Sequence, residues 1–187
     1  MREVPSFWGF DPAPISPHYR KGFIICGFPG IGKTDLAKKP LLVPHYRIIE
    51  EDSSVCLGYH GNANFVAEYC KELENTCQRN TIVLASTHQK VLDELFGRRL
   101  PFVMIYPRRE EKDEWIARLQ SRGSSDALVN LVRNDWDALF DHFMGFIDVV
   151  KYSISSGADL LEIIEDIVTH LLDHLEGLRR EADARGE

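Results

Sequence analysis

Residues 27–34 read GFPGIGKT, preceded by the apolar run FIIC at residues 23–26 and followed by Leu36 and Ala37. The octapeptide satisfies every position of the pattern GxxxxGK[ST], in which glycines let backbone N–H groups close around phosphate oxygens. This loop acts between a buried strand and the start of a helix, and the flanking residues predict that context. The stretch therefore predicts a phosphate-binding loop, or P-loop, in an α/β fold.

The residue types within the loop indicate separate tasks. Lys33 is expected to bridge phosphate oxygens of a bound nucleotide, and the Thr34 hydroxyl is expected to ligate Mg²⁺. Backbone amides at the helix N-terminus point at the phosphates. The predicted nucleotide-binding residues of the loop are Gly27, Phe28, Pro29, Gly30, Ile31, Gly32, Lys33, Thr34 and Asp35. The alternative is a glycine turn with an incidental lysine.

Length and composition favour one globular domain. The chain has 187 residues, of which 44% are hydrophobic and 27% charged, which allows a sizeable core. No apolar run approaches the roughly 20 residues that span a bilayer, and the amino-terminal residues lack the apolar segment of a secretion signal. We therefore expect a cytoplasmic protein with no membrane partner.

Charge and cysteine usage limit the partners. The formal net charge of −7 counts against a broad grip on DNA or RNA, because that affinity depends on many Lys and Arg contacts with phosphates. A small local basic site stays open. Cys26, Cys56, Cys70 and Cys77 show no CxxC spacing, which argues against a disulfide or zinc framework and favours reduced thiols.

Hydrophobic periodicity predicts alternating strands and helices after a proline-rich start. We expect an extended arm at residues 1–20, the P-loop domain at 21–176 and a solvated helix end at 177–187. The expected strands are 23–26, 46–50, 81–86, 101–106 and 149–154, and the expected helices lie before Pro40, at 64–78, 88–96, 110–121 and 125–143, and from 158. Right-handed crossovers then give a three-layer α/β/α P-loop NTPase fold with a mainly parallel five-stranded sheet.

Acidic and hydroxyl groups gather after the second predicted strand, where residues 50–54 read EEDSS. Alternate residues on a strand share a face, so Glu50 and Asp52 are both expected to face the crevice beside the P-loop. We assign Glu50 to Mg²⁺ or its waters, and Asp52 to orienting an acceptor hydroxyl and taking its proton. The alternative is a solvated polar turn.

The third predicted strand ends in Ser86, Thr87 and His88, without an acidic residue. A separate Walker B aspartate of the GTPase or motor-ATPase kind is therefore not visible there, which favours a kinase. We expect His88 to be a helix-start residue packed against the sheet. The tryptophans Trp8, Trp115 and Trp136 could stack on a base, although the spacing of Trp136 with Leu139 and Phe140 favours the core.

These motifs together resemble the small P-loop kinases, the shikimate, gluconate and nucleoside monophosphate kinase superfamily. The chain is most similar to phage and microbial nucleotide-kinase-like ATP-binding proteins, with patterns near GFPGIGK[ST], DxDSS, STHxxV and YPxxxxKxxW. The matching residues are Gly27 to Thr34, Glu50 with Asp52 to Ser54, Ser86 to His88 with Val91, and Tyr106, Pro107, Lys112 and Trp115. Glu50 stands where that pattern has its first aspartate.

The resemblance implies an ATP- and Mg²⁺-dependent kinase, with a nucleoside monophosphate as the first acceptor class. It also implies a lid after the fourth strand whose arginines close on the phosphates, which assigns catalytic roles to Arg118 and Arg122. The alternative is a solvated helix in which Glu114 pairs with Arg118. Gly157 would fall where such kinases contact the nucleotide base.

The acceptor region is expected at residues 56–64, CLGYHGNAN, a polar loop with Tyr59, His60 and Asn64 as candidate contacts. Two other functions stay open. One is a nucleotide-binding module without transfer activity, and the other is a polynucleotide 5′-hydroxyl kinase. Plain ATP hydrolysis is disfavoured by the missing Walker B pattern, and the oligomeric state is open.

Overall fold

The structure is a computed structural model that describes residues 22–38, 46–51, 64–78, 80–147, 149–161, 163, 164, 166, 167 and 169. Several predictions made from the sequence lie outside these residues. They concern the arm at 1–20, the catalytic role of Asp52, the contacts of Tyr59 and His60, and the helix end at 177–187.

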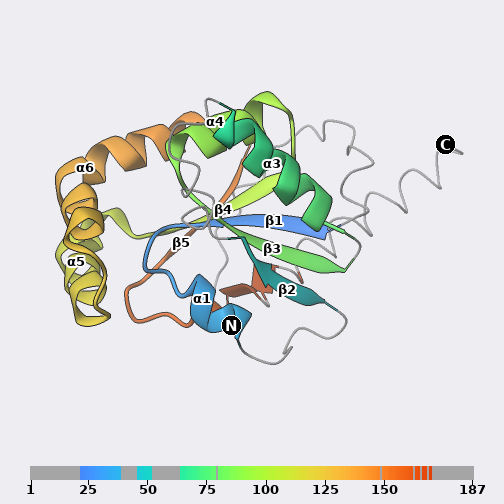
Figure 1. Cartoon of the computed structure of the whole chain (residues 1–187). Helices are drawn as coiled ribbons and strands as arrows, with labels where there is room; N and C mark the ends of the chain where they lie inside the picture. The colour runs from blue at the N-terminus through green and yellow to red at the C-terminus, as the bar shows by residue number, and fades with distance from the viewer. Residues whose placement is uncertain are drawn as a thin grey trace, which may run out of the picture.

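The described residues form a five-stranded sheet (Figure 1). Its strands are β1 (Gly22–Gly27), β2 (Arg47–Glu50), β3 (Thr81–Ser86), β4 (Phe102–Pro107) and β5 (Val150–Ile154). Their order is β2-β3-β1-β4-β5, and every neighbouring pair is parallel. The predicted parallel five-stranded sheet is therefore confirmed, with β1 at its centre.

The helices cover both faces of this sheet, which explains the apolar strand sequences. They are α1 (Lys33–Ala37), α3 (Phe65–Thr76), α4 (Gln89–Gly97), α5 (Lys112–Ser121) and α6 (Asp126–Gly145), with the 3₁₀ turn η3 (Arg109–Glu111) before α5. In Figure 1, α3 and α4 lie on one face, α1 lies on the other, and α5 and α6 stand beside the edge where the P-loop leaves β1. All six residues of β1 are buried, as expected for a central strand covered on both faces.

Two buried tryptophans mark the side of the core that faces α5 and α6. Trp115 and Trp136 are 0% and 2% exposed, and both pack edge-on against Phe28 of the P-loop. Phe143 of α6 completes this aromatic group. The prediction that Trp136 belongs to the core is confirmed, whereas the suggestion that Trp115 stacks on a base is wrong because its ring is fully buried.

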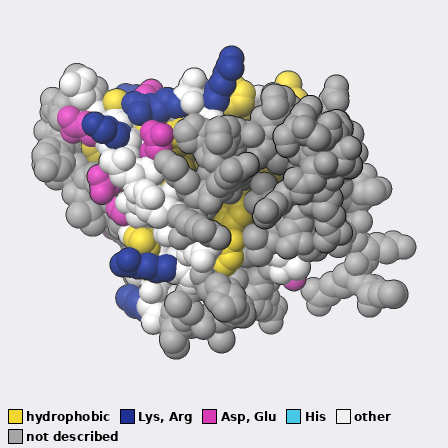
Figure 2. Space-filling view, turned by 90° about the vertical axis from the view of Figure 1, so that its right-hand side faces the viewer, with side chains coloured by type: hydrophobic (Ala, Val, Ile, Leu, Met, Phe, Trp, Pro, Cys, Tyr) yellow, Lys and Arg dark blue, Asp and Glu magenta, His cyan; other side chains and the backbone are white. Residues whose placement is uncertain are grey.

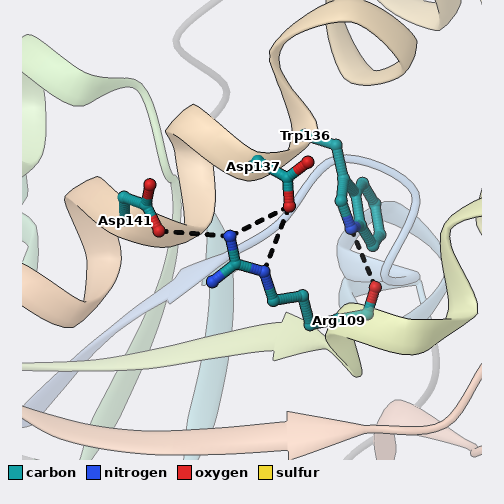
Figure 3. Close-up of polar contacts among 4 residues, drawn as sticks. All are labelled: Arg109, Trp136, Asp137 and Asp141. Carbon is teal, nitrogen blue, oxygen red and sulfur yellow. Dashed lines mark hydrogen bonds and ion pairs between the residues drawn. The ribbon is translucent and has the colours of Figure 1, made fainter.

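Helix α6 is tied to the end of β4 through Arg109, as Figure 3 shows. The Trp136 Nε1–H donates to the Arg109 carbonyl at 2.9 Å, and the Arg109 guanidinium pairs with Asp137 at 2.9 Å and Asp141 at 3.2 Å. Exposed ion pairs contribute little to stability, so the buried indole is the stronger anchor. The η3 turn and α6 are thereby held together next to the P-loop.

Two features of the described residues concern membranes and nucleic acids. No helix within the described ranges is long and apolar enough to cross a bilayer. In Figure 2, the described part of the face shows basic and acidic side chains interspersed rather than one continuous basic patch. This distribution agrees with the negative net charge and gives no support, on that face, to extended nucleic-acid binding.

Candidate active site

The P-loop is held to the sheet by its backbone. The Phe28 N–H donates to the Ile105 carbonyl of β4 at 2.9 Å, so the chain stays attached to the neighbouring strand after β1 ends. Gly30 and Gly32 then adopt φ values of 84° and 105°, in the left-handed region that other residues avoid. Gly32 is also the N-cap residue of α1. The glycines of the motif are therefore required by the shape of the loop.

Lys33 lies back over this loop. Its Nζ donates to the Gly27 carbonyl at 2.6 Å, and its methylene carbons pack close to the Gly27 backbone. This arrangement holds the ammonium group at the mouth of the loop rather than in bulk solvent. A phosphate placed on the loop amides would meet this positive charge directly.

Thr34 and Glu50, the two residues predicted to hold the metal, are brought together from different elements. The Thr34 Oγ1–H in the first turn of α1 donates to Glu50 Oε1 at the end of β2, with 2.9 Å between the oxygens. A hydroxyl and a carboxylate are the oxygen ligands that Mg²⁺ prefers. No cluster of three or more His, Cys, Asp or Glu side chains occurs in the described part of the chain.

Glu51, one residue further along the chain, belongs to the opposite face of the sheet. Its carboxylate accepts from the Thr76 hydroxyl at 3.1 Å, and its carbonyl accepts from the Tyr69 hydroxyl at 2.6 Å, both on α3. The alternation predicted for this acidic segment is therefore observed between Glu50 and Glu51.

The polar residues that follow β3 have structural positions in the described part of the chain. Thr87 is buried, and the Ser86 hydroxyl accepts from the His88 N–H at 3.3 Å. His88 is the N-cap residue of α4, which confirms the predicted helix start. The expected packing of its side chain against the sheet is wrong, because His88 is solvent-exposed where the extended backbone enters the helix.

A pocket of about 350 Å³ opens beside the P-loop. Residues of the loop and of α1 form one wall, residues after β5 form another, and Arg118 joins the two. The lining residues are Ile31, Gly32, Asp35, Leu36, Arg118, Gly157, Ala158, Asp159 and Leu160. Gly157, predicted to contact a base, thus lies in the same pocket as the predicted loop residues and Arg118.

The two predicted lid arginines have different surroundings. The Arg118 guanidinium donates to the Ser156 carbonyl and lies 5.1 Å from the centre of the Trp115 ring. This contact replaces the alternative pairing with Glu114, which is not among the ion pairs of the described residues. Arg122 is the exposed C-cap residue of α5, which ends at Ser121. It does not line the pocket.

Two contacts of this site were missed in the sequence. The Trp115 Nε1–H donates to the Pro29 carbonyl of the P-loop at 2.9 Å, and Glu111 accepts a hydrogen bond from the Ser156 N–H. The only available signal was the position of Trp115 in the YPxxxxKxxW pattern, which does not specify a partner. Both contacts join residues that are far apart in the chain, so no local pattern could have revealed them.

Two of the described cysteines, Cys26 and Cys70, are buried packing groups. Burial raises the pKa of Cys26 far above its ordinary value, and burial raises the pKa of Cys70 to about 11. Cys26, directly before the P-loop, is therefore a neutral thiol and not a nucleophile.

A parallel sheet with the P-loop after its central strand defines the P-loop NTPase fold. One similar solved structure is a gluconokinase from Sinorhizobium meliloti 1021, with a TM-score of 0.55 and 14% sequence identity over 88% of this chain and 98% of that chain. At this identity the likeness shows the fold, and it confirms the fold predicted from the sequence. No protein-family profile and no curated protein sequence matches the chain.

Proposed function

We propose that the protein is a kinase that transfers the γ-phosphoryl group of Mg·ATP to a small-molecule acceptor. The observation that carries this proposal is the Thr34–Glu50 hydrogen bond of 2.9 Å beside Lys33. Phosphoryl transfer needs charge neutralisation at the phosphates more than it needs covalent chemistry. A hydroxyl, a carboxylate and an ammonium group at the mouth of one P-loop meet this need.

The donor half of the reaction is assigned to the loop. The P-loop amides and Lys33 bind the β- and γ-phosphates, and Thr34 with Glu50 holds Mg²⁺ directly or through water. The metal neutralises charge that develops on the transferred group. Lys33 leaves the Gly27 carbonyl for phosphate oxygens when the nucleotide binds, and so exchanges one hydrogen bond for a charge-assisted one.

The nucleoside half of ATP is assigned to the pocket beside α1. Its walls of Gly32, Leu36 and Gly157–Leu160 lie to one side of the P-loop, and Arg118 offers a planar guanidinium to a base. The Arg118 Nη1–H donates to the Ser156 carbonyl, whereas Nη2 lies 4.0 Å from the position that a Cβ on Gly32 would take, beside the P-loop. We place Arg118 at the nucleoside and keep its catalytic role at the phosphates as a further part of the proposal.

The acceptor is proposed from the sequence resemblance. A nucleoside monophosphate is the first class, with residues 56–64 as the acceptor region. For an acceptor that presents a hydroxyl, Asp52 is the residue that orients this hydroxyl and takes its proton. The structural neighbour is a gluconokinase, which makes a sugar acid the second class. We place the activity in the cytoplasm, on the basis of composition and free thiols.

The test is ADP production from Mg·ATP over a panel of acceptors. The panel contains nucleoside monophosphates, nucleosides, gluconate and other small hydroxy acids, and 5′-hydroxyl oligonucleotides. Lys33→Ala is the inactive variant, and Lys90→Ala, which removes an exposed lysine of α4, is the matched control. Stimulation by one acceptor that is lost only in Lys33→Ala supports the kinase and names its substrate. A flat panel with ATP still bound would replace it with a nucleotide-binding module.

A further inference from the structure

Helix α5 contacts both chain segments that line the nucleotide pocket. Glu111, Trp115 and Arg118 follow one another at spacings of four and three residues, which places them on one face of the helical segment. Trp115 contacts the P-loop, and the other two contact the segment after β5. One helix face thus bridges two loops that are more than 120 residues apart in the chain.

The contact with the P-loop is buried and close. The Trp115 Nε1–H donates to the Pro29 carbonyl at 2.9 Å, and the indole packs edge-on against Phe28 with 6.2 Å between ring centres. A Cβ atom on Gly30 would lie 2.7 Å from Leu119 Cδ2 and 3.4 Å from Trp115 Nε1. The helix therefore packs directly on the loop backbone, and glycine at position 30 makes this approach possible.

The contact with the segment after β5 involves both backbone polar groups of Ser156. The Ser156 N–H donates to the Glu111 carboxylate, and the Ser156 carbonyl accepts from the Arg118 guanidinium. The Arg118 guanidinium also lies over the Trp115 ring. The position of Trp115 is thus linked to the loop carbonyl on one side and to the pocket arginine on the other.

We propose that Trp115 is a positioning residue that holds the P-loop, and through Arg118 the pocket wall after β5, in the conformation that binds nucleotide. The proposal rests on the proposed function, in that the loop it positions is the phosphate site. Trp115 itself is fully buried and touches no reacting group. Its loss is expected to weaken nucleotide binding because the Pro29 carbonyl loses its donor and the loop gains freedom.

The experiment compares Trp115→Phe with Trp136→Phe. Both wild-type indoles are buried, both pack edge-on against Phe28, and both donate to a backbone carbonyl at 2.9 Å. They differ in the carbonyl, which belongs to the P-loop for Trp115 and to Arg109 for Trp136. The readouts are the Kd for Mg·ATP, kcat and KM of the transfer, the thermal midpoint, and hydrogen exchange of the amides at residues 30–34.

For Trp115→Phe we expect the Kd for Mg·ATP to rise about tenfold, the change that corresponds to one hydrogen bond. Hydrogen exchange of the amides at residues 30–34 should become faster, and KM for ATP should change more than kcat. Trp136→Phe should lower the thermal midpoint of unfolding about as much as Trp115→Phe does. It should leave the Kd for Mg·ATP and the exchange rates within about twofold of wild type. Equal effects of the two variants on Kd and exchange, or no effect of Trp115→Phe, would overturn the proposal.

A second variant covers the case in which Trp115→Phe does not fold. Benzothienylalanine incorporated at position 115 keeps the ring shape and replaces the indole N–H by sulfur, so only the hydrogen bond to Pro29 is lost. Failure of the proposed function would look different: ATP affinity would be the same in Lys33→Ala and in wild type. Faster exchange at residues 30–34 in the position-115 variants alone would still support the positioning role, and unchanged exchange would overturn it.

Discussion

The two flanks of the P-loop are built from different chemistry. On one flank, Trp115 and Leu119 of α5 pack against Pro29 and Gly30 through buried apolar surface and one indole hydrogen bond. On the other flank, Thr34 of α1 meets Glu50 of β2 through a hydroxyl and a carboxylate. Trp115 and Leu119 have no group that could take part in phosphoryl transfer, whereas Thr34 and Glu50 have the oxygen atoms that a metal needs.

This difference separates position from chemistry. Close packing fixes a loop because small shifts of buried groups cost contacts that nothing replaces. A polar pair can exchange partners when a ligand arrives, because its hydrogen bond can be replaced by a metal–oxygen bond. We therefore expect substitutions on the apolar flank to act on stability and nucleotide affinity, and substitutions on the polar flank to act on metal use and turnover.

Removal of the loop ammonium should have the largest effect on turnover. Lys33→Met keeps the apolar stem that packs on Gly27 and loses the charge. Turnover at saturating Mg·ATP is expected to fall at least about a hundredfold, the size typical of losing one charge-stabilising donor. Steady-state kinetics with Lys90→Met as control measures this effect. A decrease of less than about threefold would mean that Lys33 does not stabilise the reacting phosphate.

The second largest effect is expected from Glu50→Gln, which removes the carboxylate charge from the polar flank. The amide is similar in size but carries no charge, so the Mg²⁺ concentration for half-maximal activity is expected to rise about 10- to 100-fold. Glu51→Gln is the matched control, since Glu51 is adjacent but faces Thr76 on the opposite side of the sheet. A titration with Mg²⁺ at fixed ATP distinguishes the two variants. Identical curves for both would remove Glu50 from the metal site.

On the apolar flank, Gly30→Ala tests the close packing between α5 and the P-loop. The added Cβ meets Leu119 at 2.7 Å, and the φ of 84° is unfavourable for alanine. Unfolding free energy in urea is expected to fall by about 1–3 kcal/mol, with weaker ATP binding. Gly97→Ala is the control, because nothing lies within 4 Å of its added Cβ. Equal stability of the two variants would mean that α5 does not press on the loop.

The smallest expected effect concerns the buried thiol of Cys70 on α3, which belongs to neither flank of the P-loop. Burial raises the pKa of Cys70 to about 11 from its ordinary 9.0, so the folded protein keeps a proton that the unfolded chain loses. The contribution of this thiol to the unfolding free energy is fully present below pH 9, and it is lost as the pH rises from 9 to about 11. Thermal melts of wild type and Cys70→Ala measure it. The variant should show the shallower alkaline decline, and parallel declines would contradict this origin.

Much of the fold follows from local sequence patterns. The expected strand 81–86 coincides with β3, and the expected helix 64–78 contains α3 (Phe65–Thr76), because apolar periodicity is strong in both. The glycines of residues 27–34 and the proximity of Thr34 to Glu50 could also be predicted, since the motif and the strand end meet at the same edge of a parallel sheet.

The missed parts of the site depend on tertiary contacts. The contacts of Arg118 were not predicted: it donates to Ser156 instead of pairing with Glu114, and it lies over a ring that is itself fixed by Pro29. Its predicted role as a lid arginine stays a prediction. Helical spacing identifies which residues share a face, yet it does not say what that face packs against. The same limit explains His88, whose position at a helix start was predicted while its exposure was not.

The most direct test of this account is calorimetric titration of Mg·ATP into wild type, Lys33→Met, Glu50→Gln and Trp115→Phe. We predict that wild type binds Mg·ATP, and that Lys33→Met and Trp115→Phe bind it more weakly when Mg²⁺ is present. Of the four proteins, Glu50→Gln should have the ATP affinity that depends most strongly on the Mg²⁺ concentration. Affinities that are the same in all four proteins, or no binding by wild type, would contradict the assignment of residues 27–34 as a nucleotide site with one positioning flank and one chemical flank.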